Sequence, residues 1–533
     1  MIITDNMAWL VSIILALSLF LRVSLLNVVP PELFGDEIDV GYQAYSLLKT
    51  GKDLYGQILP TYIHSLSEWR APLLMYATVP TVAAFGSNEW GVRLPSAIFG
   101  SLAPIILFLL VTETFKNWKL KIGICASIAL AVMPWHVWYS RAAFETVLML
   151  DLTMLGTLLF LKKRFSLGLL FLALAMYTYS TATLFIPLWI LFLHFFTRTR
   201  PKILSLVLLA VILTPLIFNT ISGRASARFE LLSVFNSSDI FKNQQLRKDD
   251  TFLPIIWHNK FEYSARAFLN NYLRAFSTDF LFIRGDPVFR HSPQVTGQLL
   301  PLSAPFVVLG LWYLAKRKQW LWFVWLLLAP LPAALTADGG YHATRLFFMI
   351  PPLAVAMGAG FLQLPKSLGY FLLLLLTINF IWVGHYYVVH YPKDASVWWH
   401  VGYKDVLTKL ANISPDYSRV FINNTYEPSL ERFLFWTKYS PALFHKSFII
   451  DKPQAEVVPN YNGFTLDGKY YFGNFSKTDY RSYLIPGSLY LISQRDNVDG
   501  DWDWRVSPPD NITVLATSTN LSNQPLFYLI TRK

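Results

Sequence analysis

Long apolar runs recur through residues 1–390, and small groups of Lys and Arg separate many of them. A helix that crosses a bilayer needs roughly 20 mostly apolar residues, and basic residues collect in the loops on the inner side of a membrane. With 54% hydrophobic residues, 15% charged residues and a mean hydropathy of +0.39, the chain of 533 residues is too apolar for a soluble protein. The pattern predicts a polytopic α-helical membrane protein.

The net charge of +12 does not indicate nucleic-acid binding. The basic residues lie between apolar runs, as in Lys162-Lys163-Arg164 and Lys316-Arg317-Lys318, which is how basic residues are distributed in membrane proteins. The single cysteine, Cys125, lies inside an apolar run, so the chain has neither a disulfide framework nor a thiolate metal site. Membrane lipids, and no nucleic acid, are the expected surroundings of the chain.

Hydropathy and charge together predict about eleven spans, with the N-terminus inside and the C-terminus outside. The first apolar run, Met7–Val29, has no cleavage site and is expected to be retained. The segment Ala71–Gly86 is expected to lie at the membrane surface, because it has only about 16 residues and contains Pro72 and Pro80. With that assignment every basic cluster falls inside and every long polar loop falls outside. The spans are 7–29, 93–115, a run that reaches 139, 145–161, 165–180, 181–196, 203–219, 298–315, 320–336, 345–364 and 368–390.

Two domains follow from the change of composition after His390, where Asn, Asp and Tyr become common and the apolar runs shorten. Residues 1–390 form the membrane domain, with a first outer loop at 30–92 and a long outer loop at 220–297. Residues 391–533 are expected to form an extracytoplasmic α/β domain, which is long enough for a core of its own. The expected helices are 403–413 and 429–439, and the expected strands are 420–422, 447–450, 469–472, 489–493, 512–517 and 526–531.

Two adjacent carboxylates, Asp36 and Glu37, stand at the start of the first outer loop. Removing a charge from water at a membrane surface is costly, so such a pair needs a reason. A helical pattern follows, with apolar and aromatic residues at 38, 42, 45 and 48 and with Gly51 at its end. Asp36 therefore lies at or near a helix N-terminus, where it can cap the helix, act as a catalytic base, or do both. Glu37 is a further catalytic candidate, because its charge can raise the pKa of Asp36.

A second acidic site lies at the outer end of a span, in the stretch Ser140–Glu145. Arg141 and Glu145 are either a surface ion pair, worth about 0–1 kcal/mol, or part of a catalytic site. Asp151 lies deeper in the same apolar run. It is a further candidate, although a buried and hydrogen-bonded structural role explains it slightly better.

A third stretch, Asp338–Arg345, is a short outer loop with two glycines, His342 and Arg345. Arginine presents a planar fork that matches phosphate oxygens, so Arg345, with help from Arg70 or Arg141, is expected to bind a lipid phosphate. The alternative is that Arg345 reaches to lipid head groups without a specific role.

The residues of the outer loops neither establish nor exclude a binding site for a divalent metal ion. His258 and His291 lie in the long outer loop, and His64 and Glu68 lie in the first. These side chains are suitable ligands, but their spacing matches no metal motif, and ordinary polar loop residues would look the same.

Five short motifs occur in a fixed order along the chain. They are Phe34-Gly35-Asp36-Glu37, Arg70-Ala71-Pro72-Leu73, Phe85-Gly86, Arg93-Leu94-Pro95-Ser96-Ala97-Ile98-Phe99-Gly100, and Ser140-Arg141 with Glu145. In these motifs and their order the chain resembles the bacterial members of glycosyltransferase family 39, relatives of the protein O-mannosyltransferases and of the lipid A aminoarabinose transferase, which have the GT-C membrane fold.

The resemblance implies a sugar donor linked to polyprenyl phosphate, an extracytoplasmic active site in the cell membrane, and Asp36 as the catalytic base. Glu145 stands where many relatives have Asp, and Arg70 stands where the usual pattern begins with Lys. The metal-binding carboxylate of the family has no match in register, since Glu68 is close but offset.

The predicted function is transfer of a sugar from the lipid-phosphate donor to an acceptor hydroxyl, with inversion of the anomeric centre. The acceptor is a protein, a lipid or a polysaccharide, and the sequence does not separate these. Two other functions stay open, a transporter and a non-catalytic envelope assembly protein. Transporters tend to contain repeated halves and broken helices at matching positions, and the sequence has neither.

Overall fold

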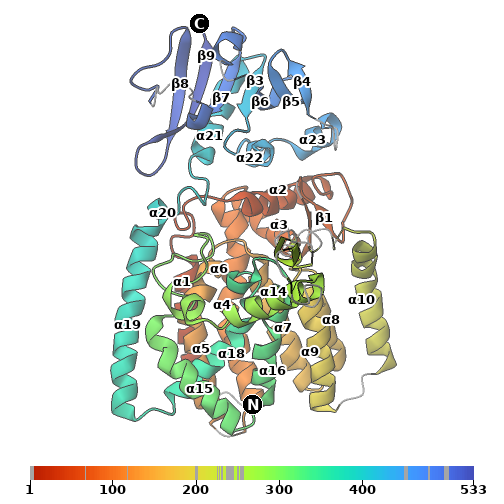
Figure 1. The fold of residues 1–533 in the computed structure, drawn as a ribbon, viewed down its shortest axis with the longest axis vertical. Helices are drawn as coiled ribbons and strands as arrows, with labels where there is room; N and C mark the ends of the chain where they lie inside the picture. Colours follow the sequence, from red (N-terminus) through yellow and green to blue (C-terminus); the bar gives the residue numbers. More distant parts are fainter. Residues whose placement is uncertain are drawn as a thin grey trace.

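The protein, described here from a computed structural model, has a body of helices and a C-terminal domain that contains a β-sheet (Figure 1). The helices of the body run roughly side by side, and helix α2 (Gly35–Thr50) lies across them, beneath the C-terminal domain (Figure 1). The structure describes residues 5–66, 68–116, 118–198, 202–224, 226, 229, 232–235, 245–248, 251, 257–448, 454–477, 480–496 and 503–533.

The helical body also contains a short antiparallel pair of strands in the first loop (residues 30–92), β1 (Ile63–His64) and β2 (Trp69–Arg70). Its other helices are α1 (Asp5–Val23), α3 (Leu73–Phe85), α4 (Glu89–Thr114), α5 (Lys119–Val132), α6 (Pro134–Ser140), α7 (Glu145–Leu161), α8 (Phe165–Ala175), α9 (Ala182–Thr197), α10 (Ile203–Ile221), α14 (Lys260–Arg274), α15 (Ala304–Lys316), α16 (Trp320–Leu328), α17 (Leu331–Ala334), α18 (Ile350–Phe361), α19 (Lys366–Val389) and α20 (Tyr391–Asp394).

Three of the described helices, α4, α10 and α19, are long and apolar enough to cross a bilayer. A fourth span results if α5 and α6, which meet at an angle of 56°, are counted together. The bend follows from Pro134, because proline lacks the N–H that would continue the helix. Prolines also divide the apolar run at 320–336 into α16 and α17. A multi-pass membrane protein is therefore supported, and the predicted count of about eleven spans stays a prediction.

Helix α3 occupies the segment that was predicted not to cross the membrane. It has 13 residues and contains Pro80, which gives a length of about 20 Å. The hydrocarbon core of a bilayer is about 30 Å thick. Helices α8 and α15, which occupy predicted spans, have 11 and 13 residues and are no longer than α3, so the surface position of α3 and the sidedness of the loops stay predictions.

The C-terminal domain has a seven-stranded sheet in the order β4-β5-β6-β3-β7-β9-β8. The central strand β3 (Val420–Asn423) is buried along its whole length and pairs in parallel with β6 (Tyr470–Phe475) and β7 (Leu489–Ser493). The other pairs are antiparallel. The remaining elements are β4 (Ala455–Val458), β5 (Tyr461–Leu466), β8 (Ile512–Thr519), β9 (Pro525–Arg532), α21 (Tyr403–Ile413), α22 (Leu430–Trp436) and α23 (Pro441–Ser447).

The α/β class predicted for residues 391–533 agrees with these elements. Helix α21 and strand β7 have the predicted bounds, and the other predicted elements overlap observed ones, with one exception. The strand predicted at 447–450 is wrong at Ser447, which ends helix α23, and its residues 449 and 450 lie outside the described residues. Strands β4 and β5 were not predicted.

Helix α2 and the C-terminal domain share one hydrophobic core. Buried side chains of α2, among them Ile38 and Tyr42, pack in one cluster with Phe433 and Phe435 of α22 and with apolar residues of the sheet. A Cβ atom at Gly41 would lie 2.5 Å from the Phe435 ring, so the two helices can approach only because this residue is glycine. The first loop is therefore packed between the helical body and the C-terminal domain.

Candidate active site

A cavity of about 290 Å³ lies where the start of α2, strand β2 and the start of α7 meet. It contains five of the side chains that the sequence singled out, namely Asp36, Arg70, Glu145, His291 and His342. Its other lining residues are Phe34, Tyr62, Trp69, Ala71, Phe144, Thr178, Tyr179, Ser180, Arg290 and Thr344. Residues that lie far apart in the sequence thus converge on one polar cavity.

Arg70 is the centre of a cluster of carboxylates. Its NH2 lies 2.6 Å from Asp36 Oδ1 and 2.8 Å from Glu68 Oε1. Its Nε lies 3.5 Å from Asp39 Oδ2, and its NH1 lies 3.8 Å from Glu145 Oε1. Burial alone would lower the pKa of Arg70, but the surrounding carboxylates outweigh it and raise that pKa well above its usual value. Arg70 is therefore a permanent cation that orders the acidic groups around it.

The acidic groups of this cluster differ in how far they reach solvent. The side chain of Asp36 is 45% exposed, whereas those of Glu145 and Asp39 are 13% and 3% exposed. Burial, together with the nearby Glu431 carboxylate, raises the pKa of Asp39. Asp36 is thus the carboxylate of the cluster that a substrate in the cavity can reach most easily. Asp39 contacts Arg70 on the buried side of the cluster.

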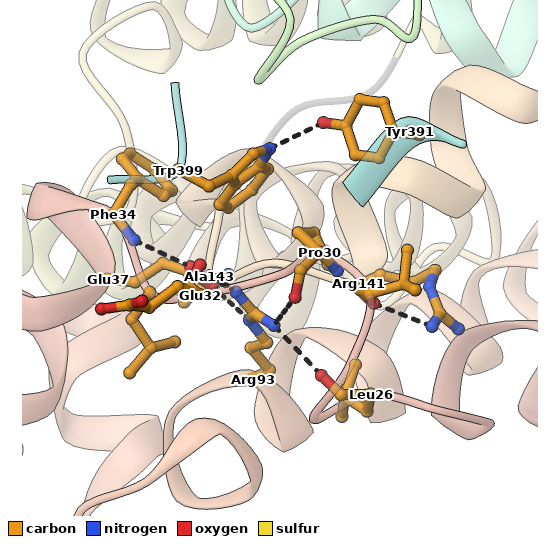
Figure 2. A network of polar contacts seen from close by, with 12 residues as sticks. Leu26, Pro30, Glu32, Phe34, Glu37, Arg93, Arg141, Ala143, Tyr391 and Trp399 are labelled. Carbon is orange, nitrogen blue, oxygen red and sulfur yellow. Dashed lines mark hydrogen bonds and ion pairs between the residues drawn. The ribbon is translucent and has the colours of Figure 1, made fainter. Parts of the chain in front are cut away.

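Glu37, the neighbour of Asp36, points away from the cavity. Its carboxylate and the guanidinium of Arg93 are both fully buried and form two parallel bonds, Nε to Oε1 at 2.8 Å and NH2 to Oε2 at 2.9 Å (Figure 2). Glu37 Oε1 also accepts a hydrogen bond from the Ala143 N–H at 3.0 Å. The geometry places Glu37 in a structural ion pair, which joins the turn before Glu145 to the start of α2.

Arg93 connects this ion pair to the segment that precedes α2. Its NH1 donates to the carbonyl oxygens of Leu26 and Pro30, at 3.1 and 2.8 Å, and its NH2 donates to the carbonyl oxygen of Glu32 at 2.7 Å (Figure 2). A planar guanidinium with five donors is suited to satisfying several buried acceptors at once. The motif Arg93–Gly100 therefore contributes to the site by holding the turn that carries Asp36.

Arg141 does not line the cavity. It donates to the carbonyl oxygens of Leu21 and Val29, both at 2.8 Å, and its guanidinium lies 5.7 Å from the centre of the Tyr387 ring. In Figure 2 it lies beside the Arg93 network. The structure thus places Arg141 where it supports the segment between α1 and α2.

Arg345 lines a second cavity, of about 110 Å³, which shares Tyr179 and Ser180 with the first. Its guanidinium forms an ion pair with Asp338 and donates to Thr336 Oγ1 at 2.6 Å. The second cavity is more apolar than the first, with Leu184, Phe229, Leu232, Pro332 and Leu335 in its wall. The structure therefore brings Arg345 next to the first cavity without placing it inside.

Arg290 lines the first cavity and was missed by sequence reasoning. Its guanidinium lies over the Phe34 ring, 5.0 Å from the centre. Its Nε is buried, and no described residue accepts a hydrogen bond from it. An arginine in this state is suited to an anionic ligand. The sequence contained one signal for Arg290, which is its position directly before the candidate His291 in the same polar loop.

Asp286, His291 and His342 form a cluster whose potential ligand atoms lie within 4.8 Å of one another. Asp286 Oδ2 lies 3.0 Å from His291 Nδ1 and accepts from the Ala343 N–H at 2.8 Å. Although burial opposes it, the hydrogen bond with His291 lowers the pKa of Asp286. One carboxylate and two imidazoles are a donor set typical of zinc, so these residues fit a divalent metal ion.

The other three metal candidates from the sequence, His64, Glu68 and His258, do not belong to that cluster. The His64 ring stacks on Trp69, with 4.6 Å between the ring centres. Glu68 pairs with Arg70, and His258 precedes Asn259, which caps helix α14. Asp286 was not predicted, because only the packing of the long loop against the 338–345 stretch brings it to His342. Asp151, the further candidate, is buried inside α7 and does not line the cavity.

Residues 70–219 match the family model described as dolichyl-phosphate-mannose-protein mannosyltransferase, and no match was found among the curated proteins. The structure of ArnT from Cupriavidus metallidurans bound to undecaprenyl phosphate is 12% identical in sequence, with a TM-score of 0.53 and coverage of 98% of both chains. The Archaeoglobus fulgidus oligosaccharyltransferase in complex with Zn and sulfate has 13% identity and a TM-score of 0.43, over 80% of this chain and 61% of that one.

The likeness to ArnT extends over both the helical body and the C-terminal domain, so it concerns the fold as a whole. At 12% identity this likeness establishes the architecture, but it does not identify the substrate. The resemblance inferred from the sequence motifs is confirmed: the chain has the fold of the GT-C membrane glycosyltransferases, and its residues 70–219 match the protein mannosyltransferase family.

Proposed function

We propose that the protein is a membrane glycosyltransferase, which moves a sugar from a polyprenyl-phosphate donor to an acceptor hydroxyl on the outer side of the cell membrane. The observation that carries this proposal is a single cavity that contains the exposed carboxylate of Asp36 and the cations of Arg70 and Arg290. A carboxylate can take a proton from the acceptor, and fixed cations stabilise a phosphate as it leaves. The fold shared with ArnT, which was solved with undecaprenyl phosphate, supports this class of donor.

The reaction needs one displacement. The acceptor oxygen attacks the anomeric carbon from the face opposite the phosphate, and its proton passes to Asp36. A new carbon–oxygen bond forms as the bond between the anomeric carbon and the phosphate oxygen breaks. The polyprenyl phosphate leaves with the electron pair, and the anomeric centre is inverted. Glu145, which also lines the cavity, is the second candidate for the base.

Arg290 is the cation that we assign to the donor phosphate. Arg70 is already paired with four carboxylates, whereas Arg290 forms no ion pair with a described residue and its buried Nε has no acceptor among them. His342 lines the same cavity and can add a second donor. Arg345 lines the apolar second cavity, and we assign it to the lipid near its phosphate. This assignment moves the main phosphate contact from Arg345 to Arg290.

We also propose a divalent metal ion at Asp286, His291 and His342. The donor set of the three side chains, within 4.8 Å of one another, supports it. When bound, the ion would supply positive charge beside the phosphate. His291 and His342 would then present their rings to the cavity in a fixed orientation, held through Asp286 and its bond to the Ala343 N–H.

The experiment is transfer from a defined polyprenyl-phosphate sugar by the purified protein in lipid bilayers. Transfer to a peptide, a glycolipid or a polysaccharide acceptor would name the acceptor class. Mass analysis of surface glycans after deletion of the gene would identify the missing sugar. A protein that transfers no sugar from any such donor, and whose deletion leaves every surface glycan unchanged, would contradict the proposal.

A further inference from the structure

Helix α22 of the C-terminal domain contacts the turn that carries Asp36. Arg432, with a side chain that is 3% exposed, donates from NH1 to the carbonyl oxygen of Leu33 at 3.2 Å. Leu33 lies three residues before Asp36, in the segment that leads into α2. The contact joins residues 399 positions apart in the sequence. The C-terminal domain therefore reaches the backbone of the candidate catalytic turn.

Arg432 is itself held in place by two further groups. Its Nε forms an ion pair with Glu427, and its NH2 lies 2.6 Å from His400 Nδ1. Burial, reinforced by the charge of Arg432, lowers the pKa of His400 to about 3, so this imidazole is neutral. Because Arg432 can only donate, Nδ1 of His400 accepts, and its Nε2–H donates to Glu427 Oε2 at 3.1 Å. The three side chains form a closed network in which the guanidinium has one orientation.

Other contacts fix the first loop to the same domain along its length. The Leu66 N–H donates to Glu431 Oε1 at 3.3 Å, the Tyr42 hydroxyl donates to the carbonyl oxygen of Tyr439 at 3.0 Å, and His445 Nε2 lies 2.8 Å from the carbonyl oxygen of Asp53. These contacts stabilise the docking of the two parts. Of these four contacts, that of Arg432 lies nearest to Asp36 in the sequence.

We infer that the C-terminal domain is part of the catalytic apparatus, and that Arg432 positions Asp36. Arg93 contacts the carbonyl oxygen of Glu32 from the helical body, and Arg432 contacts that of Leu33 from the C-terminal domain. Two adjacent carbonyl groups are thus fixed by two buried arginines from different parts of the molecule. The inference rests on the proposed function, because it assigns Arg432 a role in placing the base of that reaction.

The expected effect is on turnover, because a catalytic group must be held within about 0.5 Å of its productive position, and a displacement of about 1 Å can cost roughly 10²-fold in rate. Arg432→Gln removes the fork that joins Leu33, Glu427 and His400. We expect kcat to fall by about 10-fold or more, with the KM for the lipid donor unchanged, because Arg432 does not line the cavity. Arg432→Lys keeps the charge and should recover part of the loss.

Arg505→Gln is the matched control. Arg505 belongs to the same domain and forms an ion pair with Asp503 at 2.6 Å, and it donates two hydrogen bonds to Asn523 of that domain. This variant should keep the kcat of the wild type. If Arg432→Gln does not fold, Glu427→Gln provides the second test, since it removes the carboxylate that orients Arg432 and leaves the arginine in place.

Hydrogen–deuterium exchange of the full-length protein separates this inference from the proposed function. Amides of residues 34–40 should exchange faster in Arg432→Gln than in the wild type, and amides of the sheet should not. Exchange needs no substrate, so it reports on the turn even if no sugar donor is ever turned over. Unchanged kcat in Arg432→Gln, or unchanged exchange at residues 34–40, would overturn the role of Arg432. A fall in kcat accompanied by faster exchange throughout the domain would also overturn it, since that result means general destabilisation.

Discussion

The Arg70 guanidinium lies 2.6 Å from Oδ1 of Asp36, so the candidate base is bound to a cation that three further carboxylates share. This relationship fixes the direction of the Asp36 carboxylate without burying it, because the side chain remains 45% exposed. Because these carboxylates neutralise Arg70, this residue can contribute little positive charge to a bound phosphate. The positive charge available to the donor must come largely from elsewhere in the cavity, and Arg290 is placed to supply it.

Asp36→Asn should abolish most of the turnover. The amide keeps the size of the side chain and can still accept a hydrogen bond from Arg70, but it cannot take a proton. Loss of a general base typically costs 10²–10⁴-fold, so we expect kcat to fall by about 10²-fold or more, with donor binding preserved. The measurement is transfer from a polyprenyl-phosphate sugar by the purified variant, with thermal denaturation as the control for folding. A stable Asn variant with full activity would show that Asp36, which follows the N-cap Phe34 in the first turn of α2, serves only as a partner of Arg70, and Glu145 would then become the candidate base.

The local parts of this site could be read from the sequence. Helix α2 begins at Gly35, next to the predicted Asp36, and ends at Gly51 in the left-handed conformation with φ of 69°, because capping and glycine signals act over a few residues. The remaining contacts could not be predicted in this way. Glu37 and Arg93 are 56 positions apart, and Arg432 and Leu33 are 399 apart. Only the packing of the whole chain decides that Glu37 turns inward while Asp36 faces the cavity.

Arg290→Gln should weaken the use of the donor. A hydrogen bond to a charged group is worth about 1.5–3 kcal/mol, so removal of the guanidinium should raise the KM for the lipid-linked sugar by roughly 10- to 100-fold. Arg290→Lys keeps the charge without the planar fork and should give an intermediate value.

Arg345 provides the comparison for that experiment. The sequence-based assignment predicts a severe loss for Arg345→Ala and an intermediate loss for Arg345→Lys. The geometry favours a smaller effect, because Arg345 lies in the second cavity and pairs with Asp338. A severe loss for Arg345→Ala, together with normal donor use by Arg290→Gln, would return the phosphate contact to Arg345.

The metal proposal predicts about one zinc ion per chain when the protein is purified without chelators. His291→Ala and His342→Ala should each lower the metal content strongly, because each removes one of three donors. His258→Ala is the matched control, since His258 does not belong to the cluster. Elemental analysis by mass spectrometry gives the metal content independently of activity. Equal metal content in all three variants would mean that Asp286 serves only to orient His291.

Arg93→Gln should destabilise the protein more than it alters the chemistry. The substitution leaves the buried carboxylate of Glu37 without its cation, and breaking a buried ion pair from one side typically costs about 3–5 kcal/mol. Denaturation in detergent should therefore show a clear loss of stability. The double variant Arg93→Met with Glu37→Met should recover part of it, because no unpaired charge remains. A single variant as stable as the wild type would mean that water or another group compensates Glu37.

Glu32 joins the first loop to the C-terminal domain and should make that junction sensitive to pH. Its carboxylate accepts the N–H groups of Gly402 and Lys404, at 2.8 and 2.6 Å. Burial nevertheless raises the pKa of Glu32 to about 7, from 4.5 in the unfolded chain. The folded protein therefore holds this proton more tightly than the unfolded chain does. The resulting stabilisation is fully present below pH 4.5 and is lost as the pH rises towards 7.

Glu32→Gln tests this directly, because the amide does not titrate. Its NH2 group leaves one of the two N–H donors without an acceptor, which destabilises the variant by an amount that does not depend on pH. The difference in unfolding free energy between the variant and the wild type should therefore shift in favour of the variant as the pH rises from 5 to 8. The full effect of the shift is on the order of 3 kcal/mol. Thermal denaturation of both proteins across this range gives the measurement. A difference that does not change with pH would mean that the two N–H donors outweigh burial, so that Glu32 stays ionised and the junction is insensitive to protons.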